Sequence, residues 1–194
     1  MTKLVVDLDD FYDETDALDK LVAIKEKYPN FKITLFTIPG KISLPLLKKA
    51  KKLGFIQMAV HGYDHHDNYE FSKPTEEEAM KLLFKRGNLS YYVKGFKAPG
   101  WQISVGAMKA LSRMNFWVAV QYPDDRMNGH PDGPYQPAVI DGLPYYSHNM
   151  PPEGYIGIHG HIWDCCGNGI DVIIKEIEKY PTDIEFEYID NLFK

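Results

Sequence analysis

Apolar and polar positions alternate along this chain in blocks that predict strands separated by helices. Short apolar runs typical of strands cover 4–8, 31–36, 55–60, 93–96, 116–120, 155–158 and 184–188. Amphipathic segments with apolar residues at helical spacing cover 16–28, 44–53, 73–86, 104–113 and 170–180. This order predicts βα units around a mostly parallel sheet or barrel. Because no linker interrupts the pattern, we expect a single domain.

The stretch 121–154 departs from this pattern. Proline and glycine recur throughout it, and neither helical nor strand spacing is sustained. We therefore expect loops and short strands, with a hairpin as one alternative, in a position to cover a site.

Composition and charge narrow the class of protein. The 194 residues include 27 acidic and 22 basic side chains, and the net charge of −5 argues against a broad nucleic-acid-binding face. No apolar run approaches a membrane span, and Asp7 ends the first one, so we expect neither signal peptide nor anchor and a cytoplasmic location. The cysteines, Cys165 and Cys166, are neighbours, which excludes a disulfide framework and indicates a structural role.

Side chains suited to catalysis follow several of the predicted strands. The carboxyl ends of parallel strands meet at one edge of a sheet, where ligands bind in βα folds. The residues at these positions are Asp9 and Asp10 after the first strand, His61, Asp64, His65 and His66 after the third, Lys97, Pro99 and Trp101 after the fourth, and His159, His161, Trp163 and Asp164 after 155–158.

The pair His61 and His65 favours a metal site. Two imidazoles four residues apart, together with a carboxylate, suit a divalent ion such as zinc and leave positions open for water and substrate. If Asp10 supplies the carboxylate, Asp9 remains free as a base. The alternatives are a polar loop with unrelated histidines and a solvated acidic turn at the start of the first helix.

Five other side chains have a catalytic or binding interpretation. His159 and His161 are two residues apart in an extended segment, so both face one side and either could protonate a leaving group. Lys97 could hold Asp9 ionised, or could be a surface lysine. Trp101 and Trp163 could wall a substrate site, although core packing is the usual role of tryptophan.

Several segments, in order along the chain, resemble the motifs of the polysaccharide deacetylases, the NodB-homology enzymes of carbohydrate esterase family 4. Val6–Asp10 resembles the motif T-F-D-D-G, and the segment 33–40 is similar to the second strand, A-T-F-F-V-x-G. The segment 61–65, His-Gly-Tyr-Asp-His, resembles H-[ST]-x-x-H. The segment 95–101 resembles R-x-P-x-G, and 156–159 resembles the last motif, an apolar strand ending in histidine.

The resemblance implies a deformed (β/α) barrel of the NodB-homology type spanning residues 1–194. It implies a divalent metal, most often Zn²⁺, held by Asp10, His61 and His65, with Asp9 as general base and His159 as general acid. The implied reaction is removal of an N-acetyl or O-acetyl group from a carbohydrate or related amide by metal-activated water. We expect Trp101, Trp163 and Pro99 to contact a small or oligosaccharide substrate.

The sequence departs from the family pattern at four places, which leaves the substrate open. Phe11 replaces the glycine after the acidic pair, Gly62 stands where serine or threonine is common, and Lys97 replaces arginine. The fourth motif is not readable within 114–154. A small sugar, a glycolipid precursor and another amide are all compatible substrates.

Two other functions are compatible with parts of the sequence. The segment Val5–Asp9 resembles the D-x-D strand end of haloacid dehalogenase-like phosphatases, in which Asp7 would be the nucleophile. That interpretation leaves both histidine clusters unused. A non-catalytic, carbohydrate-binding relative of the deacetylases is the other alternative, suggested by Lys97 and Gly62.

Overall fold

The strands and helices predicted from the sequence are all present, with ends shifted by a few residues. The computed structural model describes residues 2–13, 16–66, 69–85, 89–124, 137–164 and 167–194. The strands are β1 (Lys3–Phe11), β2 (Ile33–Thr37), β3 (Ile56–His61), β4 (Gly95–Lys97), β5 (Trp117–Val120), β6 (Tyr145–Ser147), β7 (Tyr155–His161) and β8 (Glu185–Glu187). The helices are α1 (Ala17–Lys27), α2 (Leu44–Lys52), α3 (Glu76–Phe84), α4 (Val105–Arg113) and α5 (Ile170–Ile177), with 3-10 turns at Leu89–Tyr91, Pro99–Trp101 and Ile189–Phe193.

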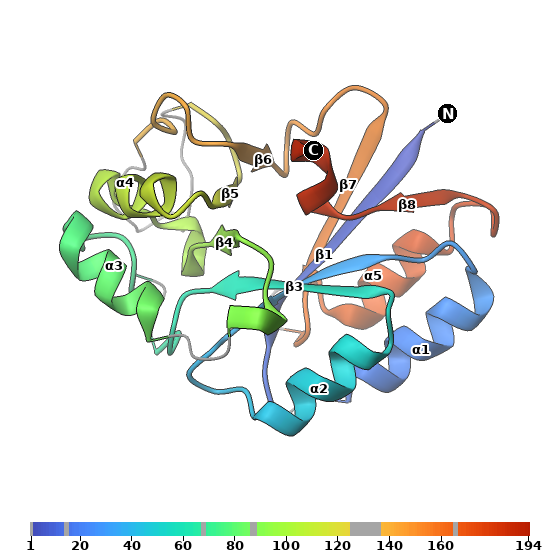
Figure 1. Cartoon of the computed structure of the whole chain (residues 1–194). Coiled ribbons are helices and arrows are strands. Elements are labelled where there is room, and N and C mark those ends of the chain that lie inside the picture. Colours follow the sequence, from blue (N-terminus) through green and yellow to red (C-terminus); the bar gives the residue numbers. More distant parts are fainter. Residues whose placement is uncertain (1, 14–15, 67–68, 86–88, 125–136, 165–166) are drawn as a thin grey trace.

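The strands form one parallel sheet that curls into a deformed (β/α) barrel, as the sequence predicted (Figure 1). Their order is β6-β5-β4-β3-β2-β1-β7, and β8 pairs with the start of β1. β6 pairs in parallel with β5, so this part of 121–154 rejoins the sheet as another parallel strand and not as a hairpin. The alternative of a hairpin was therefore wrong at this strand, because β5 and β6 run in the same direction.

Local sequence signals explain where several helices begin and end. The Ser43 and Ser104 side chains accept hydrogen bonds from backbone N–H groups in the first turns of α2 and α4. Thr75 and Glu78 form a capping box at the start of α3. Gly54, just after α2, has a φ of 74°, a left-handed conformation that glycine adopts without strain.

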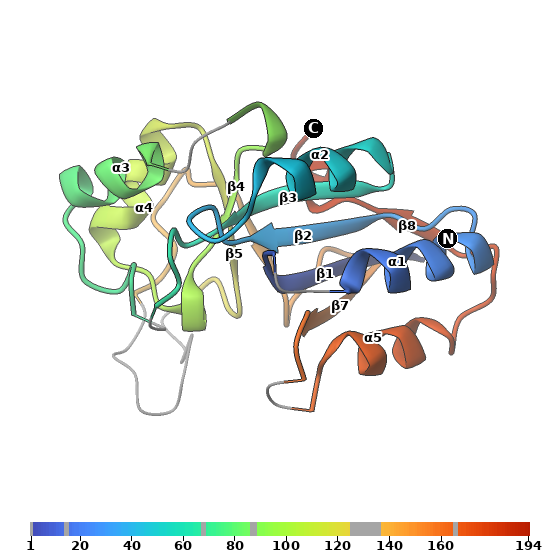
Figure 2. The ribbon, with the colours of Figure 1, turned by 90° about the horizontal axis from the view of Figure 1, so that it is seen from below.

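The helices cover the outside of the sheet (Figure 2). The outward side chains of β1, Leu4, Val6 and Leu8, belong to an apolar core shared with α1 and α5. A second core lies under α3 and α4, which also pack on each other. Burial of these two apolar cores provides the main driving force for forming the barrel wall.

The inward face of β1 changes from apolar to acidic along its length. Val5 belongs to an inner cluster with Phe36, Trp117 and Tyr146, and Ile189 of the C-terminal turn completes it. Because strand side chains alternate, the next inward positions after Val5 are Asp7 and Asp9. The apolar cluster thus fills one end of the barrel, and ionisable side chains line the end where the strands finish.

No helix among the described residues combines the length and apolar character needed to cross a membrane. The predicted structural role of Cys165 and Cys166 is not tested, since both lie outside the described residues.

Candidate metal centre and catalytic cluster

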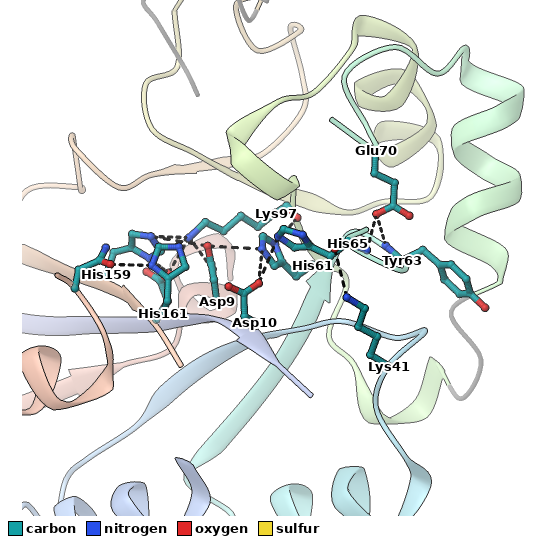
Figure 3. A network of polar contacts seen from close by, with 12 residues as sticks. Asp9, Asp10, Lys41, His61, Tyr63, His65, Glu70, Lys97, His159 and His161 are labelled. Carbon is teal, nitrogen blue, oxygen red and sulfur yellow. Dashed lines mark hydrogen bonds and ion pairs between the residues drawn. The ribbon is translucent and has the colours of Figure 1, made fainter. Parts of the chain in front are cut away.

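Asp10, His61 and His65 converge at the end of the barrel where the strands finish (Figure 3). His61 Nε2 lies 3.5 Å from Asp10 Oδ1, and His65 Nε2 lies 3.4 Å from the same oxygen. One ligand atom from each residue lies within 4.8 Å of the other two. The fold therefore brings together the three side chains, from two distant segments, that the sequence predicted as one group.

The backbone around these ligands is held in left-handed conformations. Asp10 has a φ of 67°, His65 of 45° and Gly62 of 61°, values that non-glycine residues rarely adopt. The Glu70 carboxylate stabilises the histidine loop by accepting hydrogen bonds from the backbone N–H groups of Tyr63, Asp64 and His65, at 2.9, 3.1 and 3.4 Å. Such strain persists at functional sites where surrounding contacts fix it.

The same loop explains one departure from the family motif. A Cβ atom at Gly62 would overlap the Glu70 carboxylate and would lie 2.7 Å from Pro99 Cγ. The positive φ adds to this restriction. In this chain, serine or threonine at position 62 would not fit without displacing Glu70 or Pro99.

The contacts of His61 favour a neutral ring that could bind a metal. Its Nδ1 lies 3.0 Å from the carbonyl oxygen of Lys97, so Nδ1 carries a proton that it donates there. That leaves Nε2 unprotonated and facing Asp10. Burial lowers the pKa of His61, which also favours the neutral ring. An imidazole fixed through its second nitrogen in this way is typical of metal ligands, and the donor set fits Zn²⁺ or a similar divalent ion.

A second cluster lies beside the metal ligands, deeper in the barrel. The Lys97 ammonium lies 3.1 Å from Asp7 Oδ1, 2.9 Å from Asp9 Oδ1 and 3.0 Å from His159 Nδ1. Each of these four side chains is less than one tenth exposed. Figure 3 shows that His159, Lys97 and Asp9 continue towards the candidate metal ligands, so that Asp9 stands between His159 on one side and His61 on the other.

The lysine holds both carboxylates ionised. Burial by itself would raise the pKa of Asp9, but the Lys97 ammonium and then the nearby imidazoles outweigh it and lower that pKa to about 2. The same balance, again led by Lys97, holds the pKa of Asp7 well below its usual range. Lys97 is thus a buried, paired cation and not a surface lysine.

Two further groups in the described residues have the composition of metal sites, Asp7 with His148 and His159, and Asp9 with His159 and His161. The Lys97 ammonium already lies within 3.1 Å of the acid in both groups. A metal there would have to displace a paired cation. The group of Asp10, His61 and His65 is therefore the best candidate for a metal.

The remaining predicted residues occupy different surroundings. The Trp101 ring lies over the Lys97 ammonium, 3.9 Å from the ring centroid, and beside the His159 ring. Pro99 is buried in the turn before it. His161 Nδ1 lies 3.0 Å from the Asn168 side-chain oxygen. Trp163 instead packs on Tyr12, with ring centroids 5.2 Å apart, and against the core under α1 and α5.

Three residues of the site were missed by sequence reasoning as contributors to this chemistry. Asp7 contacts His159 and Lys97, and its two-residue spacing from Asp9 was an available signal that both face inward. Glu70 holds the histidine loop, and His148 follows β6, with its ring 4.7 Å from that of His159. Nothing in the local sequence marks either of these two, since each acts through contacts made in the folded chain.

Comparison with known protein families and with curated proteins finds no match. Solved structures do match over nearly the whole chain. A peptidoglycan N-acetylglucosamine deacetylase matches with a TM-score of 0.61 and 17% identity, over 97% of this chain and 86% of that one. A family 4 acetyl xylan esterase from Clostridium thermocellum, in complex with a cobalt ion, matches with a TM-score of 0.56 and 15% identity, over 98% and 89%.

A pseudoenzyme of the same family from Bacillus anthracis matches with a TM-score of 0.61 and 13% identity, over 100% of this chain and 66% of that one. The neighbours are thus consistently carbohydrate esterase family 4 proteins. This chain has the fold of those domains, which confirms the fold implied by its motifs.

Proposed function

We propose that this protein is a metal-dependent deacetylase that hydrolyses an acetyl group on a carbohydrate or related amide. The observation that carries the proposal is the convergence of Asp10, His61 and His65 next to Asp9, a carboxylate that Lys97 keeps ionised. The similar folds of a peptidoglycan deacetylase and an acetyl xylan esterase support the reaction class.

Asp10, His61 and His65 would hold the cation, which we take to be Zn²⁺, and a bound Zn²⁺ supplies Lewis acidity that lowers the pKa of water and polarises an acyl oxygen. Asp9 is the proposed base, and the distance of 3.8 Å from its Oδ2 to His61 Nε2 supports this role. It takes a proton from the attacking water as the water oxygen bonds to the acyl carbon.

His159 is placed to act as the acid on the other side of Asp9, with its Nε2 3.8 Å from Asp9 Oδ2. It gives a proton to the leaving nitrogen or oxygen as the bond to the acyl carbon breaks, which yields acetate and the free amine or alcohol. Lys97 keeps Asp9 ionised until Asp9 accepts the proton of the water. The substrate is proposed to contact Trp101, Pro99 and Trp163. His161, whose ring lies beside that of His159, is proposed to assist it.

The test is metal content together with acetate release. Purified protein should contain about one zinc per chain, and it should release acetate from oligomers of N-acetylglucosamine or from acetylated xylan. A chelator should abolish release and added Zn²⁺ should restore it. Protein that takes up zinc but releases no acetate from any N- or O-acetylated sugar would contradict the proposed activity.

Zinc uptake without acetate release would instead favour a non-catalytic, carbohydrate-binding protein. The pseudoenzyme among the similar folds is a reason to retain this alternative.

The phosphatase alternative has less support. Asp7, its required nucleophile, is 1% exposed and is paired with Lys97 and His159. The Asp7 oxygen that would attack a phosphate ester is thus already engaged by two other side chains.

A further inference from the structure

We propose that Asp7 is a positioning residue that holds a proton on Nδ1 of His159, so that Nε2 faces Asp9 and the substrate. This inference rests on the proposed function and adds a residue whose role neither the motifs nor the neighbouring folds assign. It also gives the acid role to His159 in preference to His161.

The sheet itself brings the two side chains together. β1 and β7 pair in parallel with Asp7 opposite His159 and Asp9 opposite His161. All four residues face the barrel interior because they occupy alternate positions on their strands. The Asp7 and His159 side chains meet at 2.7 Å between Oδ1 and Nδ1, and both are less than one tenth exposed.

The short distance requires a proton between the two atoms. A carboxylate oxygen and an unprotonated ring nitrogen would repel each other at 2.7 Å through their lone pairs. Lys97 keeps Asp7 ionised, so the proton belongs to Nδ1, which donates to Asp7. The neutral ring is thereby fixed as the tautomer whose Nε2 is free to bind and release a proton.

Lys97 offers the one competing arrangement among the contacts of His159 Nδ1. Its ammonium lies 3.0 Å from Nδ1 and could donate to a bare nitrogen, which would place the proton on Nε2. Two carboxylates compete for the same ammonium, Asp7 at 3.1 Å and Asp9 at 2.9 Å. Charge-assisted hydrogen bonds to carboxylates are stronger than hydrogen bonds to a neutral ring nitrogen. Lys97 therefore donates to Asp7 and Asp9, and Asp7 accepts the proton of His159 Nδ1.

Among the described residues, the partner of His161 Nδ1 is an amide and not a carboxylate. This Nδ1 atom lies 3.0 Å from the neutral side-chain oxygen of Asn168, which is half-buried in the segment between β7 and α5. An amide oxygen orients the ring but does not stabilise an imidazolium as a buried carboxylate does. The geometry therefore favours His159 as the residue that carries and delivers a proton.

The wild-type protein provides the direct test. Nitrogen-15 NMR of the zinc-loaded protein distinguishes protonated from unprotonated ring nitrogens, and His159→Gln assigns the signals by their loss. We expect His159 Nδ1 to carry a proton at neutral and alkaline pH, with a strongly downfield proton resonance. A spectrum in which the neutral ring has a bare Nδ1 and a protonated Nε2 would overturn the proposal, whatever the protein's activity.

The variant Asp7→Asn then tests whether Asp7 positions the proton of His159 or only supports the structure. The asparagine amide can donate to Nδ1 and move the proton to Nε2, so we expect the spectrum to show the opposite tautomer. Acetate release should fall about 10³- to 10⁴-fold in kcat, with KM changed only a few-fold and zinc content unchanged. Asp9→Asn is the matched control, because it should also lose turnover but should keep the proton on Nδ1.

These readouts keep two failures apart. If no variant or wild-type protein releases acetate, the proposed function fails while the tautomer measurement still stands. If acetate is released and Asp7→Asn keeps both wild-type kcat and the Nδ1 proton, the positioning role is wrong. If Asp7→Asn does not fold, the wild-type spectrum alone decides.

Discussion

The two halves of the candidate site are built by different means. The candidate metal ligands Asp10, in the irregular end of β1, and His65, in the loop after β3, have positive φ, and their side chains are 17% and 18% exposed. The inner cluster of Asp7, Lys97 and His159 lies on regular strands and is almost completely enclosed. Left-handed backbone at a strand end and in a loop positions the first half, and strand register with charge compensation positions the second.

This difference indicates a division of work. Ligands at an accessible rim can admit a cation, water and a substrate, whereas enclosed ion pairs keep their ionisation states fixed. Asp9 joins the two halves, since it contacts both Lys97 and His61. Changes to each half should therefore produce different failures, and four experiments test that expectation.

The largest effect should come from removing one member of each half. His61→Ala should leave the purified protein without zinc and without acetate release, because two ligands hold the ion poorly. Asp9→Asn should keep zinc and lose most turnover, about 10³-fold or more, because it removes the base. Elemental analysis with an acetate assay checks both. Surviving turnover in Asp9→Asn would mean that Asp9 is not the base.

Lys97→Met should mainly reduce stability. It removes the ammonium that faces two buried carboxylates, and breaking a buried ion pair by deleting one partner costs about 3–5 kcal/mol. Urea unfolding of the metal-free protein measures the change. Lys97→Arg, which keeps the charge but changes its shape, should lose less. A Lys97→Met variant as stable as wild type would contradict the pairing described above.

His148 should make stability depend on pH. Burial lowers the pKa of His148 to about 4, whereas an unfolded histidine titrates near 6.5, so between these values the unfolded chain binds more protons. The stability that His148 contributes is therefore present above about pH 6.5 and is lost as the pH falls towards 4, by about 3 kcal/mol at most. Asp7, Lys97 and His159 face this ring.

The measurement compares wild type with His148→Gln in urea unfolding at a series of pH values, with chelator present in both. As the pH falls, the unfolding free energy of the wild-type protein should decrease more than that of His148→Gln. His61 changes stability in the same direction but is present in both proteins, so it cancels. A gap that stays constant with pH would show that His148 is not held neutral by burial.

Glu70→Gln should give the smallest effect, confined to the rim. The amide retains one acceptor oxygen and adds donors that face the N–H groups of Tyr63 and His65, so the histidine loop loosens. Zinc affinity should fall about 10- to 100-fold, measured by competition with a chelating dye. Glu78→Gln, at the capping box of α3, should leave zinc affinity unchanged. If Glu70→Gln and Glu78→Gln bound zinc with the same affinity, Glu70 would have no role in supporting the metal site.

The local sequence signals that predicted the site were strand ends and ligand spacing. Asp9, Asp10, His61 and His65 could be selected because each follows an apolar run, and parallel strands finish at a common edge. The sequence around Asp7 indicated its role less clearly. An acid within an apolar strand can be a nucleophile, an isolated buried charge or one member of an ion pair, and only its neighbours in the fold distinguish these. Nothing local distinguished Trp101, which lies over Lys97, from Trp163, which packs on Tyr12.

The order of the elements, the single parallel sheet and the inward alternation on β1 were determined by the sequence alone, because periodicity is a short-range property of the chain. Only the tertiary structure decided that Asp7 meets His159, 152 residues away, and that Lys97 pairs with two acids. Those contacts depend on the register between β1 and β7 and on the curl of the sheet. Register is a property of paired strands, so no single segment encodes it.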